Sequence, residues 1–514
     1  MEFHTKILTK IFLFSFVASA SLAANTSKVN LKELQEQIAS LQAQVNELKA
    51  SSANNNNEKV QKQIDELQDR VDENELNAAL SKVKMGLDFT VGGASVHGKI
   101  GGVKSNNENK WATEVHLNLN AQINDRTRFT GRLAMAKYWG NMGNRTFIGD
   151  YEGGRNPQGN SVVYLDRAYI DYDIIPDVFV ATIGRQPGTD GPGSNLRNSS
   201  VRMSTYPAML VNAMGDALVL TYKPQSLKDY SAAFRAGYIR FYQGSEIDIA
   251  GGRNLLGTQK GKDSNLYLLM AEGELPLGDF GKNLFILSYI HGDKYSLPID
   301  ADMPNTTLKI LDDTYNLGNN DLFNLHFESS NTFGSPFSWF VSASYYRGSK
   351  GVDNSEKIKT DIASNLNMIA AMARVFENSI PGSQAVGQAT IAGIQNKVIQ
   401  SGELNWNNKD AWAIHIGARY DFTKAFNLGF EFFHGSKYWF ALSRPGINDP
   451  LDFRNTRGNV YDIYAIWRLD LNQYLRFAYT HIDYQYANSS IPMGGTYKVN
   501  DKANIFSLFY NVRF

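Results

Sequence analysis

Cysteine is absent from this chain of 514 residues. Its absence excludes disulfides, a thiol nucleophile, a cysteine metal site and lipid attachment to a cysteine behind a leader peptide. A long hydrophobic run is also missing: after residue 24, no stretch of ~18 apolar residues could form an ordinary transmembrane helix. Finally, 51 basic residues balance 51 acidic ones. A neutral chain of this kind predicts no nucleic-acid partner.

Signatures of catalysis and metal binding are missing as well. The eight histidines form no HExxH motif, and no GxSxG motif occurs. His415 and His434 lie on expected strands near Asp421 and Glu431. No nucleophile lies at a sequence spacing from either histidine that would indicate a catalytic pair. We therefore predict no enzyme activity, no cofactor and no bound metal.

The densest turn cluster is GRQPGTDGPG at residues 184–193. It lacks the Lys-Ser/Thr pair of a phosphate-binding loop and the alternating acids of a calcium-binding loop. We interpret it as an outer loop. Arg185 at its root, with Arg197 and Arg202 further along, is a candidate to face permeating anions.

The first 24 residues are typical of a secretory signal peptide. Lys6 and Lys10 precede a short apolar stretch at residues 11–20, and small residues follow at the positions read by a signal peptidase. We expect cleavage after Ala23 or Ala24. In a bacterium such a leader implies export to the periplasm or beyond.

Residues 25–84 form a polar segment with two heptad seams. The first seam consists of Leu34, Ile38, Leu41, Val45 and Leu48, and the second of Val60, Ile64, Leu67 and Val71. The stretch SSANNNN separates them and puts them out of register, so the segment is either a kinked helix or two helices folded back. A helix this polar has little to bury without partners, which favours a short self-associating α-helical coiled coil in the periplasm.

From residue 85 the period changes to two, and residues 85–514 are predicted to form an all-β, transmembrane antiparallel β-barrel of about 16 strands, within a range of 14 to 18. In one strand Tyr461 and Ile463 oppose Asp462 and Tyr464. The predicted strands are 86–93, 112–122, 127–138, 162–173, 178–186, 216–223, 231–241, 264–275, 283–291, 321–329, 337–347, 411–421, 425–435, 459–470, 474–484 and 503–514.

Short and long connections alternate along this region, which is typical of a membrane barrel with one rim in the periplasm and the other outside. The last strand alternates up to Phe514, with Phe509 as one apolar residue on its polar face. We expect this strand to pair with the first strand near Gly86 and so close the barrel. The longest connection, 348–410, has a helical pattern that would either fold into the lumen or cap it from outside.

Charged residues on the inward face are the candidates for lining a pore, since rings of charge set ion selectivity. The alternative is ordinary pairing between neighbouring strands. The basic candidates are Arg132, Arg167, Arg235, Arg419, Arg468, Arg476 and Arg513, and the acidic ones are Asp88, Asp171, Glu328, Glu431 and Asp462. A barrel of this size is also expected to be too wide to fill with its own side chains.

Residues 85–514 resemble Gram-negative outer-membrane porins. The resemblance rests on Phe514 with its aromatic strand, on the loop rhythm, and on VYLDRAYIDY at residues 163–172 followed by TIGRQ at 182–186. This hairpin is similar to one in phosphate-selective and related porins, and to porin-like proteins with a periplasmic coiled coil ahead of the barrel. The resemblance implies an outer-membrane barrel, often trimeric, that passes small solutes, with Phe514 read as an assembly signal by the barrel-assembly machinery.

Two hypotheses follow. In the first, the protein is a porin through which small hydrophilic solutes or ions diffuse passively, embedded in outer-membrane lipid as a homotrimer. In the second, it is a structural or adhesive barrel that the coiled coil tethers to the cell wall.

Overall fold

The structure is a computed structural model. It describes residues 83–100, 103–139, 162–187, 191–200, 202, 204–212, 214–242, 263–302, 309–316, 318–349, 360–361, 363–365, 367–368, 409–443, 446–449, 451–487 and 496–514, together with residues 40, 43 and 65.

The chain divides into two compact units, Met1–Lys84 and Met85–Phe514. In the first unit the structure describes Ser40, Ala43 and Asp65, which are helical. The remainder of the predicted signal peptide and of the predicted coiled coil lies outside the described residues. No helix within the described residues is long and apolar enough to cross a membrane.

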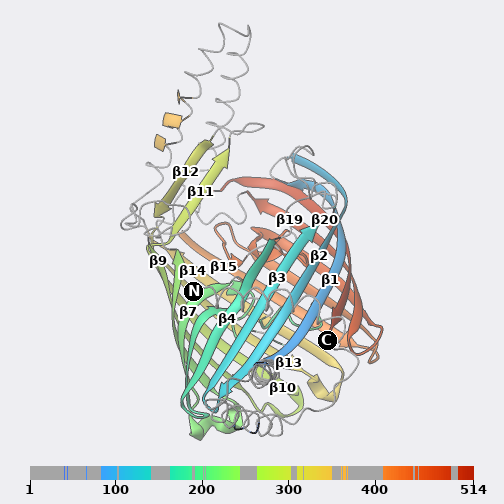
Figure 1. Ribbon diagram of the computed structural model, residues 1–514. Helices are drawn as coiled ribbons and strands as arrows, with labels where there is room; N and C mark the ends of the chain where they lie inside the picture. The colour runs from blue at the N-terminus through green and yellow to red at the C-terminus, as the bar shows by residue number, and fades with distance from the viewer. Residues whose placement is uncertain are drawn as a thin grey trace. The chain divides into compact units, whose positions relative to one another are not determined.

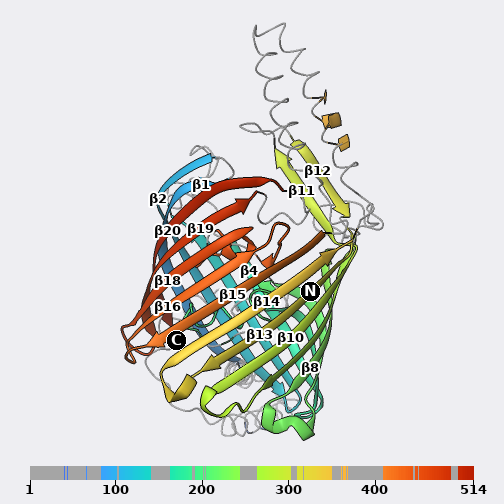
Figure 2. The same ribbon diagram turned by 180° about the vertical axis from the view of Figure 1, so that it is seen from behind.

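The second unit is a closed barrel of sixteen antiparallel strands, which confirms the predicted antiparallel β-barrel and its strand count. Figure 1 shows β1 to β4 on the near wall, and Figure 2 shows β14 to β20 from the other side. In order around the barrel the strands are β1 (Val83–Ile100), β2 (Val103–Asn124), β3 (Thr127–Tyr138), β4 (Val162–Ile175), β5 (Phe179–Gln186), β7 (Gly215–Tyr222), β8 (Ala233–Tyr242), β9 (Ser264–Glu274), β10 (Lys282–Asp293), β13 (Asn320–Ser330), β14 (Phe337–Gly348), β15 (Lys409–Asp421), β16 (Phe426–Gly435), β18 (Gly458–Arg468), β19 (Gln473–Tyr486) and β20 (Lys498–Arg513).

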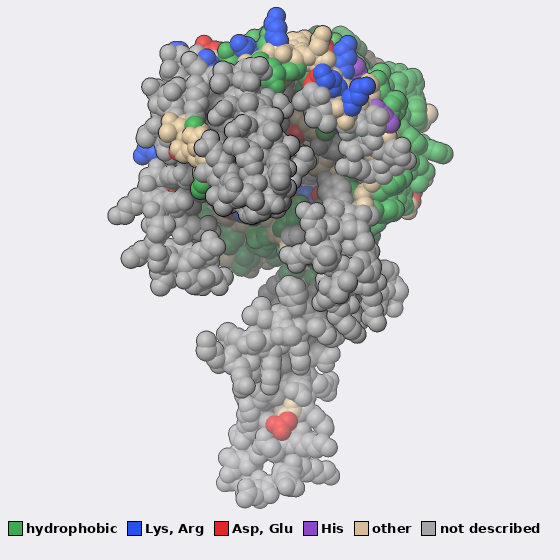
Figure 3. All heavy atoms as spheres, turned by 90° about the horizontal axis from the view of Figure 1, so that it is seen from above, with side chains coloured by type: hydrophobic (Ala, Val, Ile, Leu, Met, Phe, Trp, Pro, Cys, Tyr) green, Lys and Arg blue, Asp and Glu red, His purple; other side chains and the backbone are tan. Residues whose placement is uncertain are grey.

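The outer face of the barrel is apolar because alternate residues of each strand point outward. On β18, Tyr461, Ile463 and Trp467 are exposed, whereas Asp462 and Tyr464 are buried. Seen from above, hydrophobic side chains cover the visible outer wall and basic side chains lie along the rim (Figure 3). An apolar outer wall is what contact with lipid requires.

The barrel closes through β20 and β1, as expected. The backbone N–H of Leu87 donates to the Phe514 carbonyl at 2.6 Å, and the Phe514 N–H donates back at 3.0 Å. The Arg513 N–H donates to the carbonyl of Asn472 at 2.8 Å, which places the end of the chain beside the short β18–β19 turn. Closure of this kind leaves no unpaired strand edge in lipid.

Glycines on neighbouring strands make room for large inward aromatic rings. Phe509, the apolar residue on the polar face of β20, lies opposite Gly92 on β1. A Cβ on Gly92 would lie 2.0 Å from the Phe509 ring, and one on Gly429 would lie 2.1 Å from the ring of Tyr464. Such pairs join adjacent strands at a fixed register.

The predicted rhythm of connections is present from β2 onward, with short turns such as 125–126 and 469–472 at one end of the barrel. The expectation of a long first connection, between the predicted strands 86–93 and 112–122, was wrong, because β1 extends to residue 100 and β2 begins at residue 103. The connection after β10 contains a hairpin that was not predicted, formed by β11 (Ser296–Asp302) and β12 (Lys309–Asn316). The predicted helix in connection 348–410 is described at residues 360–361, 363–365 and 367–368, which are helical. Most of this connection lies outside the described residues, so both of its predicted placements stay predictions.

Candidate functional site: the barrel lumen

The first feature of the lumen is the connection from β5 to β7, residues 187–214, which we call the first inner loop. Its residues Leu196, Ala208, Met209 and Leu210 are almost completely buried. The interpretation of residues 184–193 as an outer loop was therefore wrong for the part that begins at Gly191. Hydrogen bonds to strands far along the chain hold this loop inside the barrel.

Glycine and proline let the first inner loop fold back on itself. A Cβ on Gly191 would lie 1.8 Å from the carbonyl oxygen of Tyr206, so this close approach requires glycine. The N–H of Ala208 donates to the Pro192 carbonyl at 2.9 Å, and the Ser194 hydroxyl donates to the Gly191 carbonyl at 2.9 Å. The loop thus satisfies part of its buried backbone internally.

The second feature is the connection from β16 to β18, residues 436–457, which we call the second inner loop. Trp439, Ala441 and Phe453 are at most 1% exposed. Within this loop β17 (Leu442–Ser443) pairs in parallel with β6 (Val211–Asn212) of the first inner loop. The two inner loops therefore form one body inside the barrel.

An apolar cluster joins this body to the wall. Met209, Leu210, Trp439 and Phe453 from the loops pack in one cluster with inward residues of the strands. The wall residues of this cluster are Val96, Leu266, Leu268, Met270, Ile286, Ile290, Leu322, Tyr346, Ala411, Ala413, Phe433, Val460, Ile482, Tyr484, Ala503 and Ile505. The lumen was predicted to be too wide for the barrel's own wall side chains to fill. In the structure, the two inner loops fill part of it.

A local sequence signal for this filling exists in β9. Strand β9 reads SNLYLLMAEGE, and its inward Leu266, Leu268 and Met270 are as apolar as its outward Leu269. A strand that is apolar on both faces is typical of one covered on both sides. Lipid covers one face of β9, and the inner loops cover the other.

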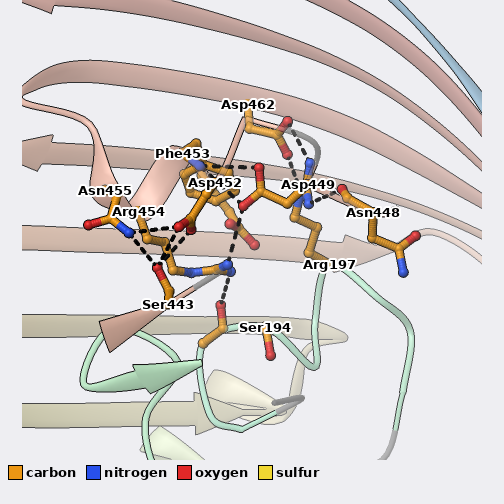
Figure 4. A network of polar contacts seen from close by, with 12 residues as sticks. Ser194, Arg197, Ser443, Asn448, Asp449, Asp452, Phe453, Arg454, Asn455 and Asp462 are labelled. Atoms are coloured by element: carbon orange, nitrogen blue, oxygen red, sulfur yellow. Dashed lines mark hydrogen bonds and ion pairs between the residues drawn. The ribbon is translucent and has the colours of Figure 1, made fainter. Parts of the chain in front are cut away.

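A polar network fixes the first inner loop to β18 (Figure 4). Arg197 donates to both carboxylate oxygens of Asp462, at 2.8 and 3.3 Å. Thr480 donates to the same carboxylate at 2.5 Å, and Arg197 also donates to the carbonyl of Asn448 at 3.0 Å. Burial alone would lower the pKa of Arg197, but the charge and hydrogen bonds of Asp462 outweigh it and raise the pKa, so Arg197 is charged.

The second inner loop carries its own buried carboxylates, also shown in Figure 4. Asp452 accepts hydrogen bonds from Ser443 at 2.7 Å and from Asn455 at 2.7 Å. Asp449 accepts from the Phe453 N–H at 3.2 Å and lies 3.7 Å from Arg454. Burial raises the pKa of Asp449 to about 6 despite the opposing charge of Arg197, and burial also raises the pKa of Asp452.

Four of the arginines named as inward candidates bind the tip of the first inner loop. Arg419 donates to the Leu196 carbonyl at 3.1 Å, Arg468 to the Ser199 hydroxyl at 2.8 Å, Arg476 to Asn198 Oδ1 at 3.0 Å, and Arg513 to the Ser199 carbonyl at 3.1 Å. The guanidinium of Arg476 also stacks on the ring of Phe509, 4.6 Å from its centroid. In this structure these side chains hold a loop in place.

The remaining candidates pair within the wall. Arg132 lies 3.5 Å from Asp88 and 3.7 Å from Asp166, which also pairs with Arg167 at 3.2 Å. Arg235 donates to Glu272 at 2.8 Å. Further pairs are Glu431 with His415 at 3.0 Å, and Glu328 with His326 at 3.5 Å. The effect of these residues on ion selectivity stays a prediction.

The other side of the lumen, lined by β1 to β8, is open in part, although its inward Val96, Arg132 and Thr221 are buried. The inward residues Asn118 and Thr182 are partly exposed, and Asn120 is exposed. A cavity of about 240 Å3 lies there, between the first inner loop and the wall, and Arg128, Lys223 and Arg235 are among its lining residues. Within the described part of the chain, no group of three or more His, Cys, Asp or Glu side chains is placed to hold a metal ion.

The family model described as "Protein of unknown function (DUF3373)" matches residues 104–512. The chain belongs to this family. The match of the DUF3373 model covers all of β3 to β19 and most of β2 and β20. No curated protein matches the chain.

Two solved outer-membrane proteins are among the structures that the chain matches. OmpT of Vibrio cholerae, folded in vitro, is 11% identical with a TM-score of 0.42, over 84% of this DUF3373 chain and 97% of OmpT. OmpF of Salmonella typhi, in complex with daunomycin, is 11% identical with a TM-score of 0.41, over 84% of this chain and 98% of OmpF.

Proposed function

We propose that the protein is a bacterial outer-membrane porin that lets small hydrophilic solutes or ions diffuse passively through the barrel. The observation that carries this proposal is the partly exposed polar inner wall of β1 to β8, with its cavity beside the first inner loop. A wall that only had to seal would be filled on this side as it is on the other. The proposed activity makes and breaks no bond, so no enzymatic step is part of it.

The apolar outer face supports a position in lipid, and the loop rhythm supports an orientation with Phe514 on the periplasmic side. We further propose a cleaved signal peptide, assembly by the barrel-assembly machinery through Phe514, and a homotrimer. Each of these rests on the sequence patterns described above.

Reconstitution of the purified chain into planar bilayers tests the porin proposal. We expect steady conductance steps, because water-exposed polar side chains line one side of the lumen. The control is the same preparation after heat unfolding, which should give no steps. A membrane that stays sealed although the inserted protein is folded would contradict the proposal.

A second candidate is a structural or adhesive barrel tethered to the cell wall. The observation that favours it is the apolar cluster inside the barrel, because a lumen packed like the core of a soluble domain suits a wall that does not conduct. Deletion of residues 28–84 should then weaken binding to isolated cell wall and leave the barrel folded. Unchanged binding would remove this candidate.

A further inference from the structure

The cavity on the β1–β8 side is bounded by strands β3, β4, β5, β7 and β8 on one side and by the first inner loop on the other. The β9–β20 side of the lumen is filled by the inner loops and their apolar cluster. Solutes that cross the barrel as proposed above therefore have to pass along the β1–β8 side. The residues around this cavity are the ones such a solute would meet.

Cationic residues outnumber acidic ones in the described lining of the cavity. Among the described residues that line it, Arg128, Lys223 and Arg235 are cationic and Asp171 is acidic. Asp171 already accepts a hydrogen bond from the Thr182 hydroxyl at 2.6 Å.

The two arginines of the lining are paired, but the lysine is not. Arg128 donates to both oxygens of Asp173, at 2.6 and 2.9 Å, and Arg235 donates to Glu272 at 2.8 Å. Lys223 is exposed and forms no ion pair with another described residue. The charge of Asp173 acts on Lys223 at longer range. With Arg202, which lies 3.9 Å from Glu272, four cations here face the three carboxylates of Asp171, Asp173 and Glu272, so one positive charge is in excess. Lys223, which has no ion pair, is the main local source of that excess.

On the side of the cavity formed by the first inner loop, the Tyr206 side chain is uncharged. Burial raises the pKa of Tyr206, in the first inner loop, to about 12, so its hydroxyl keeps its proton and donates to Gln186 at 3.3 Å. Among the described residues of the first inner loop that line the cavity, none is a carboxylate.

We propose that this basic cavity is the selectivity site of the channel and that it favours small anions over cations, with Lys223 as the main determinant. This inference rests on the proposed porin function. It moves the selectivity site away from Arg419, Arg468 and Arg476, which bind the tip of the first inner loop.

The test is the reversal potential of the channel in a gradient of potassium chloride. The reversal potential of the wild type should lie closer to the equilibrium potential of chloride than to that of potassium. Lys223→Glu should shift it toward potassium and lower the ratio of chloride to potassium permeability by roughly two- to fivefold, because the charge beside the ion path is reversed while salt screens an exposed charge over about 8 Å. Lys223→Gln should give a smaller shift in the same direction.

Lys228→Glu is the matched control. Lys228 lies five positions along the chain, in the short helix η3 (Gln225–Tyr230), and it is exposed but does not line the cavity. Its variant should shift the potential much less than Lys223→Glu does.

The outcomes separate the two proposals. A membrane that stays sealed removes both of them. Steady conductance with a cation preference, or with the same potential in wild type and Lys223→Glu, overturns the selectivity site alone and leaves the porin standing.

Discussion

The wall formed by β9 to β20 and the wall formed by β1 to β8 belong to one continuous sheet, but their inner faces differ. On β9 and β10 the inward Leu266, Leu268 and Ile286 are at most 3% exposed beneath the inner loops. On β2 the inward Asn118 and Asn120 remain in contact with water. The difference teaches that strand alternation determines which residues face inward, whereas the inner loops determine whether those residues are dry.

The largest effect is expected when the polar anchor of the first inner loop is removed. Asp462→Ala would leave Arg197 buried without its counter-charge, which typically costs about 3–5 kcal/mol. We expect the loop to leave the β9–β20 side and the single-channel conductance in planar bilayers to rise. Arg347→Ala, which breaks an exposed pair with Asp410, is the control and should leave the conductance unchanged. Equal conductance in Asp462→Ala and wild type would show that the loop does not obstruct the path.

The apolar anchor of the second inner loop should have the next largest effect. Trp439→Ala removes a fully buried ring from the apolar cluster, and truncations of this kind cost about 3–5 kcal/mol. We expect faster cleavage of residues 436–457 by an added protease. Trp467→Ala, at an outward position that is 50% exposed, should leave the cleavage rate unchanged, and a similar rate in both variants would argue against docking by Trp439.

A smaller effect is expected from pH. The pKa of Asp449 is raised by burial to about 6, so between about pH 4 and pH 6 the docked loop holds a proton that a released loop would lose. Docking of the second inner loop is therefore strongest below about pH 4 and weakens as the pH rises to about 6. Conductance should rise over the same window.

Asp449→Asn keeps the side chain neutral at every pH and should therefore remove the part of the rise in conductance with pH that Asp449 causes. Asp452, whose pKa is also raised by burial, should account for any pH dependence that remains. Identical conductance profiles for wild type and Asp449→Asn would contradict a role for Asp449.

The smallest effect on the lumen is expected at the end of the chain. Deletion of Phe514 removes two backbone hydrogen bonds to Leu87 and an exposed ring. We expect fewer assembled barrels, measured as the folded fraction on unheated gels, and unchanged conductance in those that form. Phe514→Ala keeps both backbone bonds, so an assembly defect in this variant as well would assign the signal to the ring, and normal assembly would assign it to the backbone.

The sequence predicted the barrel wall well because each strand is encoded locally. Alternation within about ten residues placed all sixteen strands, with bounds such as 127–138 for β3 matching the structure. The inner loops could not be predicted in the same way. Arg197 and Asp462, whose contact holds the first inner loop, are separated by 265 positions, and no local pattern connects them. The two-sided apolar character of β9 was a local trace of the filling.

The contacts of Ser199 with the end of the chain also have a consequence for the order of folding. Ser199 binds Arg468 and Arg513, which follow it by 269 and 314 positions. Contacts of such long sequence separation form late, because the chain between them has to be ordered first. The first inner loop is therefore synthesised long before the strands that bind it, and until β18 to β20 are in place the apolar inner face of β9 and β10 has no cover. Burial of the apolar inner wall beneath the loops is expected to be the final step of folding. A chain arrested before that step would expose this apolar surface and would be prone to aggregate.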